Sequence, residues 1–346
     1  MAVISFKPKQ VTKRLLSTLQ DRAHDIILNR YGLGDDADSK TLEAIGKKYG
    51  ITRERVRQIE NAALAAIRKS ETFKSEHKTF SELKDLVESM GTLVHEEDFL
   101  SAVAKDAITQ NHIHFYLVLG DEFKKLKEDE HFKSRWTIDE TLSDVVHDAL
   151  HDVYKNLSDK DLLSENDLVL RFIDELKDVS EQYKNEEIAK RWLSISKKIA
   201  KNPLGEWGPS DSQNVKTRGI KDFAYLMMKK HGSPMHFREV AKAIVDTFGR
   251  KTHVATTHNE LIKDPRFVLV GRGYYALQEW GYKPGVVKDV IAEILIKEGP
   301  LTKEDIVDRV LKERFLKKNT ILVNLQNPDH FKKMEDGRYT VVSKKK

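Results

Sequence analysis

One segment, from Thr41 to Glu60, constrains the fold more than any other part of the chain. Apolar residues recur at helical spacing on both sides of Gly50, as two short helices that share a small core require. Gly50 can end the first helix, because glycine adopts positive φ without a Cβ clash. Thr52 can cap the second helix, since its hydroxyl accepts from an otherwise unpaired backbone N–H. The segment therefore predicts a helix-turn-helix.

The predicted second helix opens with residue types that read base edges in DNA. Arginine pairs bidentately with guanine, glutamine pairs with adenine, and glutamate accepts from the cytosine amino group. In a helix-turn-helix, the N-terminal part of the second helix enters the major groove. The alternative interpretation is a solvated basic helix of accidental composition. The residues of these types at the start of the helix are Arg53, Glu54, Arg55, Arg57 and Gln58.

Residues from about 15 to 69, with the run TRERVRQIE at their centre, resemble region four of the bacterial primary sigma factors. In that family the module recognises a promoter element and docks on the flap of the polymerase β subunit. By matching position, the resemblance implies that Arg53, Glu54 and Gln58 face the bases, with Arg57 supporting them. Phosphate contacts, which fix register without reading sequence, are expected at Arg22, Arg30, Thr52 and Arg55.

Two features depart from that family. Residues 61–67 read NAALAAI, where the family usually has several Lys and Arg that are associated with activator contacts, so we do not expect that role here. Only about twenty residues precede Asp21, too few for the helical domain with which a sigma factor binds core polymerase and melts DNA. We therefore expect that this chain does not open a promoter by itself.

Charge is distributed unevenly over the 346 residues. Residues 1–70 hold 14 Lys and Arg against 8 Asp and Glu, whereas residues 71–200 hold 18 against 29. Residues 201–346 are basic again, with 28 against 18. Basic ends suit a polyanionic partner, and the acidic middle argues against DNA lying along the whole chain. Solubility alone is the alternative reason for the acidic middle.

An internal repeat follows the helix-turn-helix. Phe267, Gly273 and Tyr275 each lie 64 residues before Phe331, Gly337 and Tyr339. An order of three helices and a β-hairpin with glycine at its turn is that of a winged helix. The predicted fold is mainly α, with a helix-turn-helix domain followed by tandem small winged-helix domains that combine helices with a short β-hairpin. The expected boundaries are 1–70 for the helix-turn-helix, 79–138, 219–282 and 284–346 for winged helices, 139–208 for a divergent helical or winged unit, and 209–218 for a linker.

The segments 219–282 and 284–346 resemble the HARE-type winged helix, a module shared by the delta subunit of some bacterial RNA polymerases, restriction enzymes and chromatin proteins. The resemblance implies association with DNA or the transcription machinery, and no catalysis. The aromatic residues of the wings are better explained by packing of the wing on the helices. Basic residues near the third helices and wings are the candidates for DNA contact: Arg250, Lys251, Arg266, Arg272, Lys317, Lys318, Lys332 and Lys333.

Nothing in the sequence calls for an enzyme, a cofactor or a metal site. His147 and His151 lie four residues apart among aspartates, but they lack a neighbouring catalytic glutamate and an obvious third ligand, which favours a solvated acidic face. The absence of cysteine excludes disulfides and thiolate sites. No apolar stretch approaches the ~18–20 residues that span a bilayer. We expect a cytoplasmic, nucleoid-associated bacterial protein with no membrane partner and no small-molecule substrate.

Three functions remain open at this point. The favoured one is a sigma-factor-like transcription regulator that reads a promoter-type element in double-stranded DNA, with the winged helices adding DNA or polymerase contacts. The second is an adaptor that docks on the RNA polymerase core, at its β flap, without specific DNA reading. The third is a nucleoid-type DNA binder without sequence preference.

Overall fold

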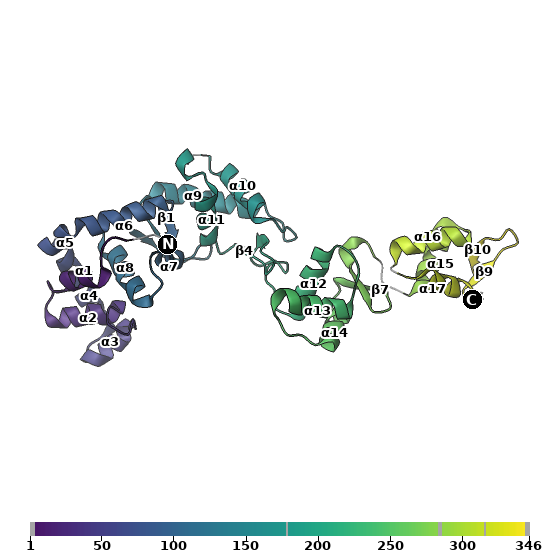
Figure 1. Cartoon of the computed structure of the whole chain (residues 1–346), viewed down its shortest axis with the longest axis horizontal. Helices are drawn as coiled ribbons and strands as arrows, with labels where there is room; N and C mark the ends of the chain where they lie inside the picture. Colours follow the sequence, from purple (N-terminus) through teal and green to yellow (C-terminus); the bar gives the residue numbers. More distant parts are fainter. Residues whose placement is uncertain (1–3, 178, 283–285, 315, 343–346) are drawn as a thin grey trace. The chain divides into compact units, whose positions relative to one another are not determined.

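The computed structural model describes residues 4–177, 179–282, 286–314 and 316–342, and it is mainly α, as predicted (Figure 1). Its short strands pair antiparallel in sheets of two or three. The chain divides into two compact units. The N-terminal unit comprises Met1–Lys201 with Gly205–Asp211, and the C-terminal unit comprises Asn202–Leu204 with Ser212–Lys346.

The N-terminal unit begins with the predicted helix-turn-helix. Gly50 ends the third helix with a φ of +66°, and the Thr52 hydroxyl accepts from the Arg55 backbone N–H at 3.2 Å. Ile26, Ile45 and Val56 are fully buried at the centre of the small core that the sequence pattern required. Residues 8–69 are called the HTH module below. They form four helices: α1 (Pro8–Leu16), α2 (Asp21–Tyr31), α3 (Leu42–Tyr49) and α4 (Arg53–Lys69).

A first winged helix follows the HTH module. Its strand β3 lies at the centre of a three-stranded sheet, between β1 and β2. One hydrophobic core, which includes Leu15, Ile67 and Phe115, joins this winged helix to the HTH module. Its elements are α5 (Glu71–Ser75), α6 (His77–Ser89), β1 (Leu93–His95), α7 (Glu96–Val103), α8 (Ala107–Leu119), β2 (Lys124–Leu126) and β3 (Arg135–Thr137).

The last part of the N-terminal unit repeats the same order. Leu163 forms an isolated bridge with Trp207, where a winged helix has its first strand. A long connection before the third helix of this unit includes the short helix η1 (Glu181–Tyr183). The elements of this second winged helix are α9 (Glu140–Lys155), α10 (Glu165–Glu175), α11 (Glu186–Ile195), β4 (Ile199–Lys201) and β5 (Trp207–Pro209).

The C-terminal unit contains two further sets of three helices and a hairpin. In the third winged helix, Gly273 has a φ of +79° at the turn between β7 and β8, and Phe267 and Tyr275 are buried as wing-packing residues. Its elements are α12 (Ile220–His231), β6 (Met235–His236), α13 (Phe237–Phe248), α14 (Val254–Lys263), β7 (Phe267–Gly271), β8 (Tyr274–Leu277) and η2 (Gln278–Trp280).

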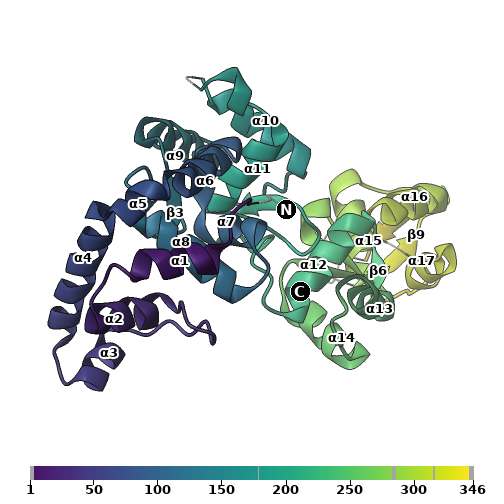
Figure 2. The same ribbon diagram turned by 60° about the vertical axis from the view of Figure 1, so that its left-hand side comes forward.

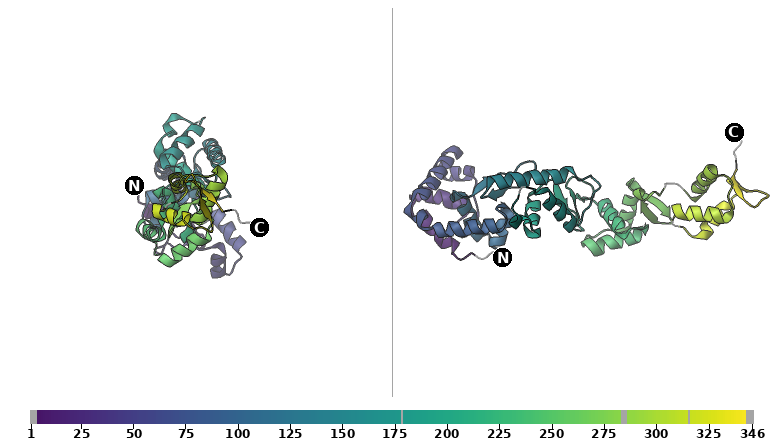
Figure 3. Two further views of the ribbon diagram at one scale, coloured as in Figure 1. Left: turned by 90° about the vertical axis from the view of Figure 1, so that its right-hand side faces the viewer. Right: turned by 90° about the horizontal axis from the view of Figure 1, so that it is seen from above.

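The fourth winged helix ends in a two-stranded hairpin, which is the yellow pair of strands in Figure 3. Phe331 on the first strand is buried in the core of this winged helix, and Leu301 forms a bridge with Tyr339. The elements are α15 (Val287–Glu298), α16 (Lys303–Glu313), α17 (Lys318–Leu325), β9 (Phe331–Lys333) and β10 (Tyr339–Val341).

Candidate nucleic-acid interface

The first two turns of α4 present the predicted base-reading residues to solvent. Val56 and Glu60 are buried on the side of α4 that faces the module. A helix turns about 100° per residue, so the residues on the opposite side of α4 point away from that core. Arg53, Glu54, Arg57 and Gln58 are accordingly all exposed.

Glu54 and Arg57 form a bidentate pair on this face. The Arg57 Nε and Nη2 atoms donate to the two Glu54 carboxylate oxygens at 3.0 and 2.7 Å. This hydrogen bonding holds the pKa of Glu54 below its usual value. The carboxylate therefore stays ionised near neutral pH and remains an acceptor, as contact with a cytosine amino group requires. Exposed ion pairs of this kind contribute little to stability, so the pair orients the Glu54 side chain more than it stabilises the fold.

A second pair orients the predicted adenine reader. The Arg55 Nη1 atom donates to the Gln58 Oε1 atom at 3.1 Å. The side-chain amide of Gln58 is thus held while its NH₂ group stays available as a donor. Arg53 differs from these residues, because its side chain makes no hydrogen bond or salt bridge within the described part of the chain. Arg53 is therefore the cation that can bind a base edge without first breaking an internal contact.

The predicted phosphate contacts have different internal commitments. The Thr52 hydroxyl accepts at the helix N-terminus and keeps its own proton as a donor. Arg22 is exposed, with its guanidinium 5.6 Å from the centre of the Tyr49 ring. Arg30 lies 3.5 Å from a carboxylate oxygen of buried Glu60 and also donates to the Lys40 carbonyl, so part of its charge is used inside the module. Of the two arginines, Arg22 is the one whose guanidinium has no carboxylate partner among the described residues.

A shallow hollow of about 430 Å³ lies at the turn between α3 and α4. Lys47 lines it together with Thr52 and Arg53. The Lys47 Nζ atom also lies 3.1 Å from the Oε1 atom of Glu43, one turn earlier on α3, and both side chains are largely exposed. The sequence interpretation did not include Lys47. The signal was a basic residue in the last turn of the first helix, which becomes informative only when the turn brings it next to Arg53.

Seven of the eight predicted cations of the C-terminal unit are exposed, namely Arg250, Lys251, Arg272, Lys317, Lys318, Lys332 and Lys333. Arg266 is the exception. Its guanidinium donates to Asp264 at 2.8 Å and to Asp222 at 2.9 Å, and it lies over the Tyr225 ring. These contacts hold β7 to α12, so Arg266 has a structural role and we leave it out of the interface.

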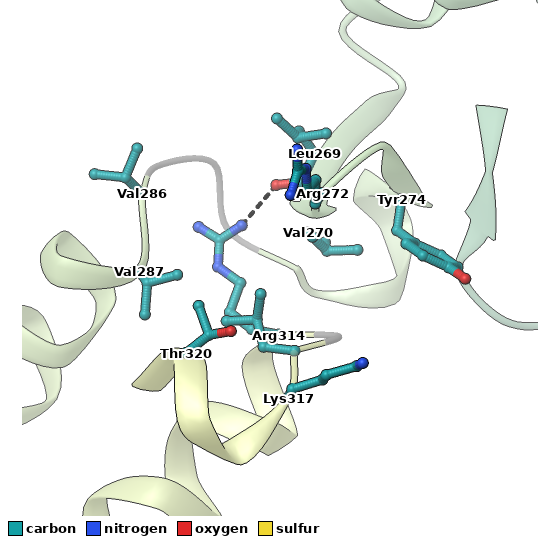
Figure 4. Close-up of a pocket in the computed structure, with 11 residues that line it drawn as sticks. Leu269, Val270, Arg272, Tyr274, Val286, Val287, Arg314, Lys317 and Thr320 are labelled. Atoms are coloured by element: carbon teal, nitrogen blue, oxygen red, sulfur yellow. Dashed lines mark hydrogen bonds between the residues drawn. The ribbon is translucent and has the colours of Figure 1, made fainter. Parts of the chain in front are cut away.

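Two of these cations line one hollow of about 860 Å³ (Figure 4). Arg272 and Tyr274 lie on one side of it, and Lys317 and Thr320 lie on the other. The Arg314 Nη1 atom donates to the Leu269 carbonyl at 2.7 Å, and this hydrogen bond crosses the hollow (Figure 4). The apolar part of the lining consists of Leu269, Val270, Val286, Val287 and Leu316.

The predicted acidic face around His147 and His151 is exposed at Asp144, Asp148 and Asp152, but the two histidines themselves are half-buried. Both rings pack on Phe132, with the His147 ring centre 4.4 Å and the His151 ring centre 5.1 Å from that of Phe132. The His147 Nε2 atom accepts from the Arg135 Nε atom at 2.8 Å. Burial, and then the charge of Arg135, lower the pKa of His147 to about 4. Within the described residues, no group of three or more His, Asp or Glu side chains could hold a metal ion.

Two family models match parts of the chain. Residues 15–69 match the family described as Sigma-70, region 4, and residues 218–280 match the HARE-HTH family, whose description names ASXL and restriction endonuclease HTH domains. Both resemblances drawn from the sequence are thereby confirmed over these residues. The first match covers the HTH module from the end of α1 to the end of α4, and the second covers the third winged helix. Together they indicate a DNA-binding protein of the helix-turn-helix type.

Among the described helices, none has the length and apolar composition to cross a membrane.

Proposed function

We propose that this chain is a transcription regulator that reads a promoter-type element in double-stranded DNA through the first two turns of α4. The observation that carries the proposal is the exposed face of that helix, on a module that matches sigma region four. Arg53 is uncommitted within the described residues, while Glu54 and Gln58 are held in place by neighbouring arginines. Pre-oriented side chains lose less conformational entropy on binding, which favours a specific contact.

Each residue has a chemical role in this proposal. Arg53 donates to guanine, Glu54 accepts from cytosine, and Gln58 pairs with adenine. Arg57 supports Glu54. Arg55 orients Gln58 and also contacts the phosphate backbone of the DNA. Thr52, Arg22 and Lys47 bind phosphates and so fix the register of the helix in the groove. Arg30 is a secondary phosphate ligand, because its guanidinium also lies beside the Glu60 carboxylate.

The C-terminal unit adds sequence-independent grip in this proposal. Its seven exposed cations lie in the wings, at the start of α17 or just before the third helices, and no acidic residue pairs with Arg272, Lys317 or Lys318 in the described residues. Exposed lysines and arginines that neutralise phosphates release counterions, so they raise affinity for any duplex. Specificity then lies in α4, and part of the affinity lies elsewhere.

The test is a titration of the full chain, at several fixed salt concentrations, against a duplex with a sigma-type upstream promoter hexamer and against a scrambled duplex. We expect tighter binding to the hexamer, and a loss of ~1–3 kcal/mol on that duplex alone for Arg53→Ala. Arg171→Ala, which removes an exposed arginine of α10, is the matched control and should change neither affinity. Equal binding of the parent to both duplexes would overturn the proposal.

The same titration tests the nucleoid-type binder, and binding to the polymerase core tests the adaptor. A nucleoid-type binder would show a steep salt dependence and no preference between the duplexes. A polymerase adaptor would form a stable complex with the polymerase core that survives both Arg53→Ala and Gln58→Ala. A promoter reader would lose its DNA preference in either variant.

A further inference from the structure

The third helix of the first winged helix, α8, is covered on nearly all sides. Of its 13 residues only Ala107 is exposed, and six are fully or almost fully buried. In a winged helix the third helix is the element that enters the major groove, which requires an exposed face. A helix that is apolar all round belongs in a core. Here α8 lies beside α1, as both views in Figures 1 and 2 show.

The HTH module supplies the cover. On one side, the Thr12 hydroxyl of α1 lies 2.9 Å from the His112 Nδ1 atom and 2.8 Å from the Tyr116 hydroxyl. On another side, the Tyr31 ring of α2 packs against the Phe115 ring, with the two ring centres 5.2 Å apart. The face that a free winged helix would offer to DNA is therefore occupied by helices of the same chain.

Hydrogen bonds fix α8 to the module near both of its ends. The Asn111 Nδ2 atom donates to the carbonyls of Gly32 and Ala37, at 3.0 and 2.9 Å. Both carbonyls belong to the connection between α2 and α3, so Asn111 holds the chain that leads into the helix-turn-helix. At the other end, the Arg68 guanidinium of α4 donates to the carbonyls of Leu119 and Val118, at 2.9 and 2.7 Å. These carbonyls lie in the last turn of a helix, where they lack partners within the helix.

The second winged helix uses its third helix in the same way. The Trp192 Nε1 atom of α11 donates to the Gly91 carbonyl beside β1, at 3.2 Å. A Cβ atom at Gly91 would lie 2.7 Å from the Ile188 side chain, so the packing of α11 leaves no room for a side chain at Gly91. Two consecutive third helices of the N-terminal unit are thus used for internal packing.

From these contacts we infer that the first winged helix is an internal dock for the HTH module and not a second DNA reader, and that Asn111 is a positioning residue for DNA reading. The second half of this inference rests on the proposed function, whereas the docking itself does not. Asn111 acts through the 32–40 connection, which sets where α3 and α4 stand relative to the rest of the unit. A module held at a fixed orientation loses less entropy when it binds a duplex.

The experiment uses the full chain with Asn111→Ala, and with Asn166→Ala on α10 as the matched exposed control. Hydrogen–deuterium exchange should rise in residues 32–40 and stay unchanged in α14. Affinity for the hexamer duplex should fall about tenfold, since two hydrogen bonds that hold the module are lost. The salt slope should not change, because no phosphate contact is removed. Tyr116→Phe, which keeps the ring and removes its hydrogen bonds to Thr12 and the Pro8 carbonyl, should give a smaller change in the same direction.

Lys105→Glu tests whether DNA approaches α8 at all. Lys105 is exposed just before the N-terminus of α8, where a recognition helix would meet phosphates. We expect no change in affinity or salt slope; weaker binding to every duplex with a reduced slope would overturn the docking inference. Unchanged exchange in Asn111→Ala would overturn it as well, and raised exchange with unchanged affinity would overturn the positioning role. If the parent shows no preference between duplexes, the proposed function fails, while the exchange result still decides whether α8 is a dock.

Discussion

The third helices α8 and α14 occupy the same place in their winged helices but have opposite surroundings. In α8 one residue of 13 is exposed, whereas in α14 six of ten are exposed. The fourth winged helix agrees with α14, since four of the eight residues of α17 are exposed. The order of elements is shared, so it cannot by itself determine whether a winged helix binds DNA.

The composition of the third helix decides the difference. Residues 113–119 of α8 read IHFYLVL, a run that buries itself on every side. Residues 254–263 of α14 read VATTHNELIK, with polar side chains on the outer face. A chain of repeated winged helices can therefore assign some copies to internal packing and leave others with a free face. Predictions that compare equivalent positions in the two units test this division.

The largest contrast is expected between Phe115→Ala in α8 and Ile262→Ala in α14. Phe115 is fully buried against Tyr31, so its truncation should cost ~3–5 kcal/mol of unfolding free energy. Ile262 is 61% exposed, and its truncation should stay within about 0.5 kcal/mol. Urea unfolding of Phe115→Ala can be followed by tryptophan fluorescence, because Trp136, Trp192 and Trp207 belong to the N-terminal unit. Similar small costs at both sites would mean that α8 is not a shared core element.

Two glycines at helix C-termini give the next contrast. Gly32 and Gly249 have nearly the same left-handed φ, +61° and +62°. Alanine at Gly249 meets nothing within 4 Å and should cost about 1 kcal/mol of backbone strain. A Cβ at Gly32 would lie 2.6 Å from the Asn111 Nδ2 atom and 2.8 Å from the Ala37 carbonyl oxygen, which should add about 1–3 kcal/mol.

Hydrogen exchange in α2 for Gly32→Ala, and in α13 for Gly249→Ala, measures each cost in its own unit. The double variant Gly32→Ala/Asn111→Ala serves as a control, because removing the Asn111 amide relieves the contact at 2.6 Å and leaves the one with the Ala37 carbonyl oxygen. Equal protection losses at the two glycines would contradict the docking of α8 on the 32–40 connection.

The helix-turn-helix could be predicted from the sequence because its signals are local. Gly50, Thr52 and the apolar spacing around them act within a few residues, and the structure places each one as the pattern required. The winged-helix order was also predictable, since helix periodicity and a glycine at the hairpin turn repeat along the chain. The exposure of the first two turns of α4 could be predicted for the same reason, because the spacing of apolar residues is a local signal.

The use of each winged helix could not be predicted in this way. Asn111 and Gly32 are separated by 79 residues, and no periodicity connects them. Arg266 looked like the other cations near a wing, but its partner Asp222 lies 44 residues away. His147 appeared solvated because the sequence does not show that Phe132 and Arg135 pack on it. Long-range packing decided these three cases.

Acidification should loosen the N-terminal unit at the joint between its two winged helices. His147 is neutral there, since burial and then Arg135 lower its pKa to about 4, and the Arg135 Nε atom donates to it. The ordinary pKa of 6.5 applies after unfolding, so the unfolded chain takes up the proton first as the pH falls. The stability contributed by neutral His147 is complete above about pH 6.5 and is lost as the pH falls toward 4. His147→Gln, which keeps an acceptor for Arg135, should show a smaller fall in the urea midpoint over this range; an identical fall would assign the effect to other groups.

The smallest expected effect concerns α17 and tests the free face of the C-terminal unit. Lys317 and Lys318 are exposed at the start of this helix, where a third helix meets the DNA backbone. If both bind phosphates, the double variant Lys317→Ala/Lys318→Ala should lower the slope of log affinity against log salt by about 2, since each contact contributes about 0.9. The ratio of hexamer to scrambled affinity should not change, because α4 alone reads bases in our proposal. Lys177→Ala, an exposed lysine of the N-terminal unit, should leave the slope as it is. If Lys177→Ala lowered the slope and the double variant left it unchanged, the assignment would be reversed. The phosphate contacts would then lie on the unit whose third helices are buried.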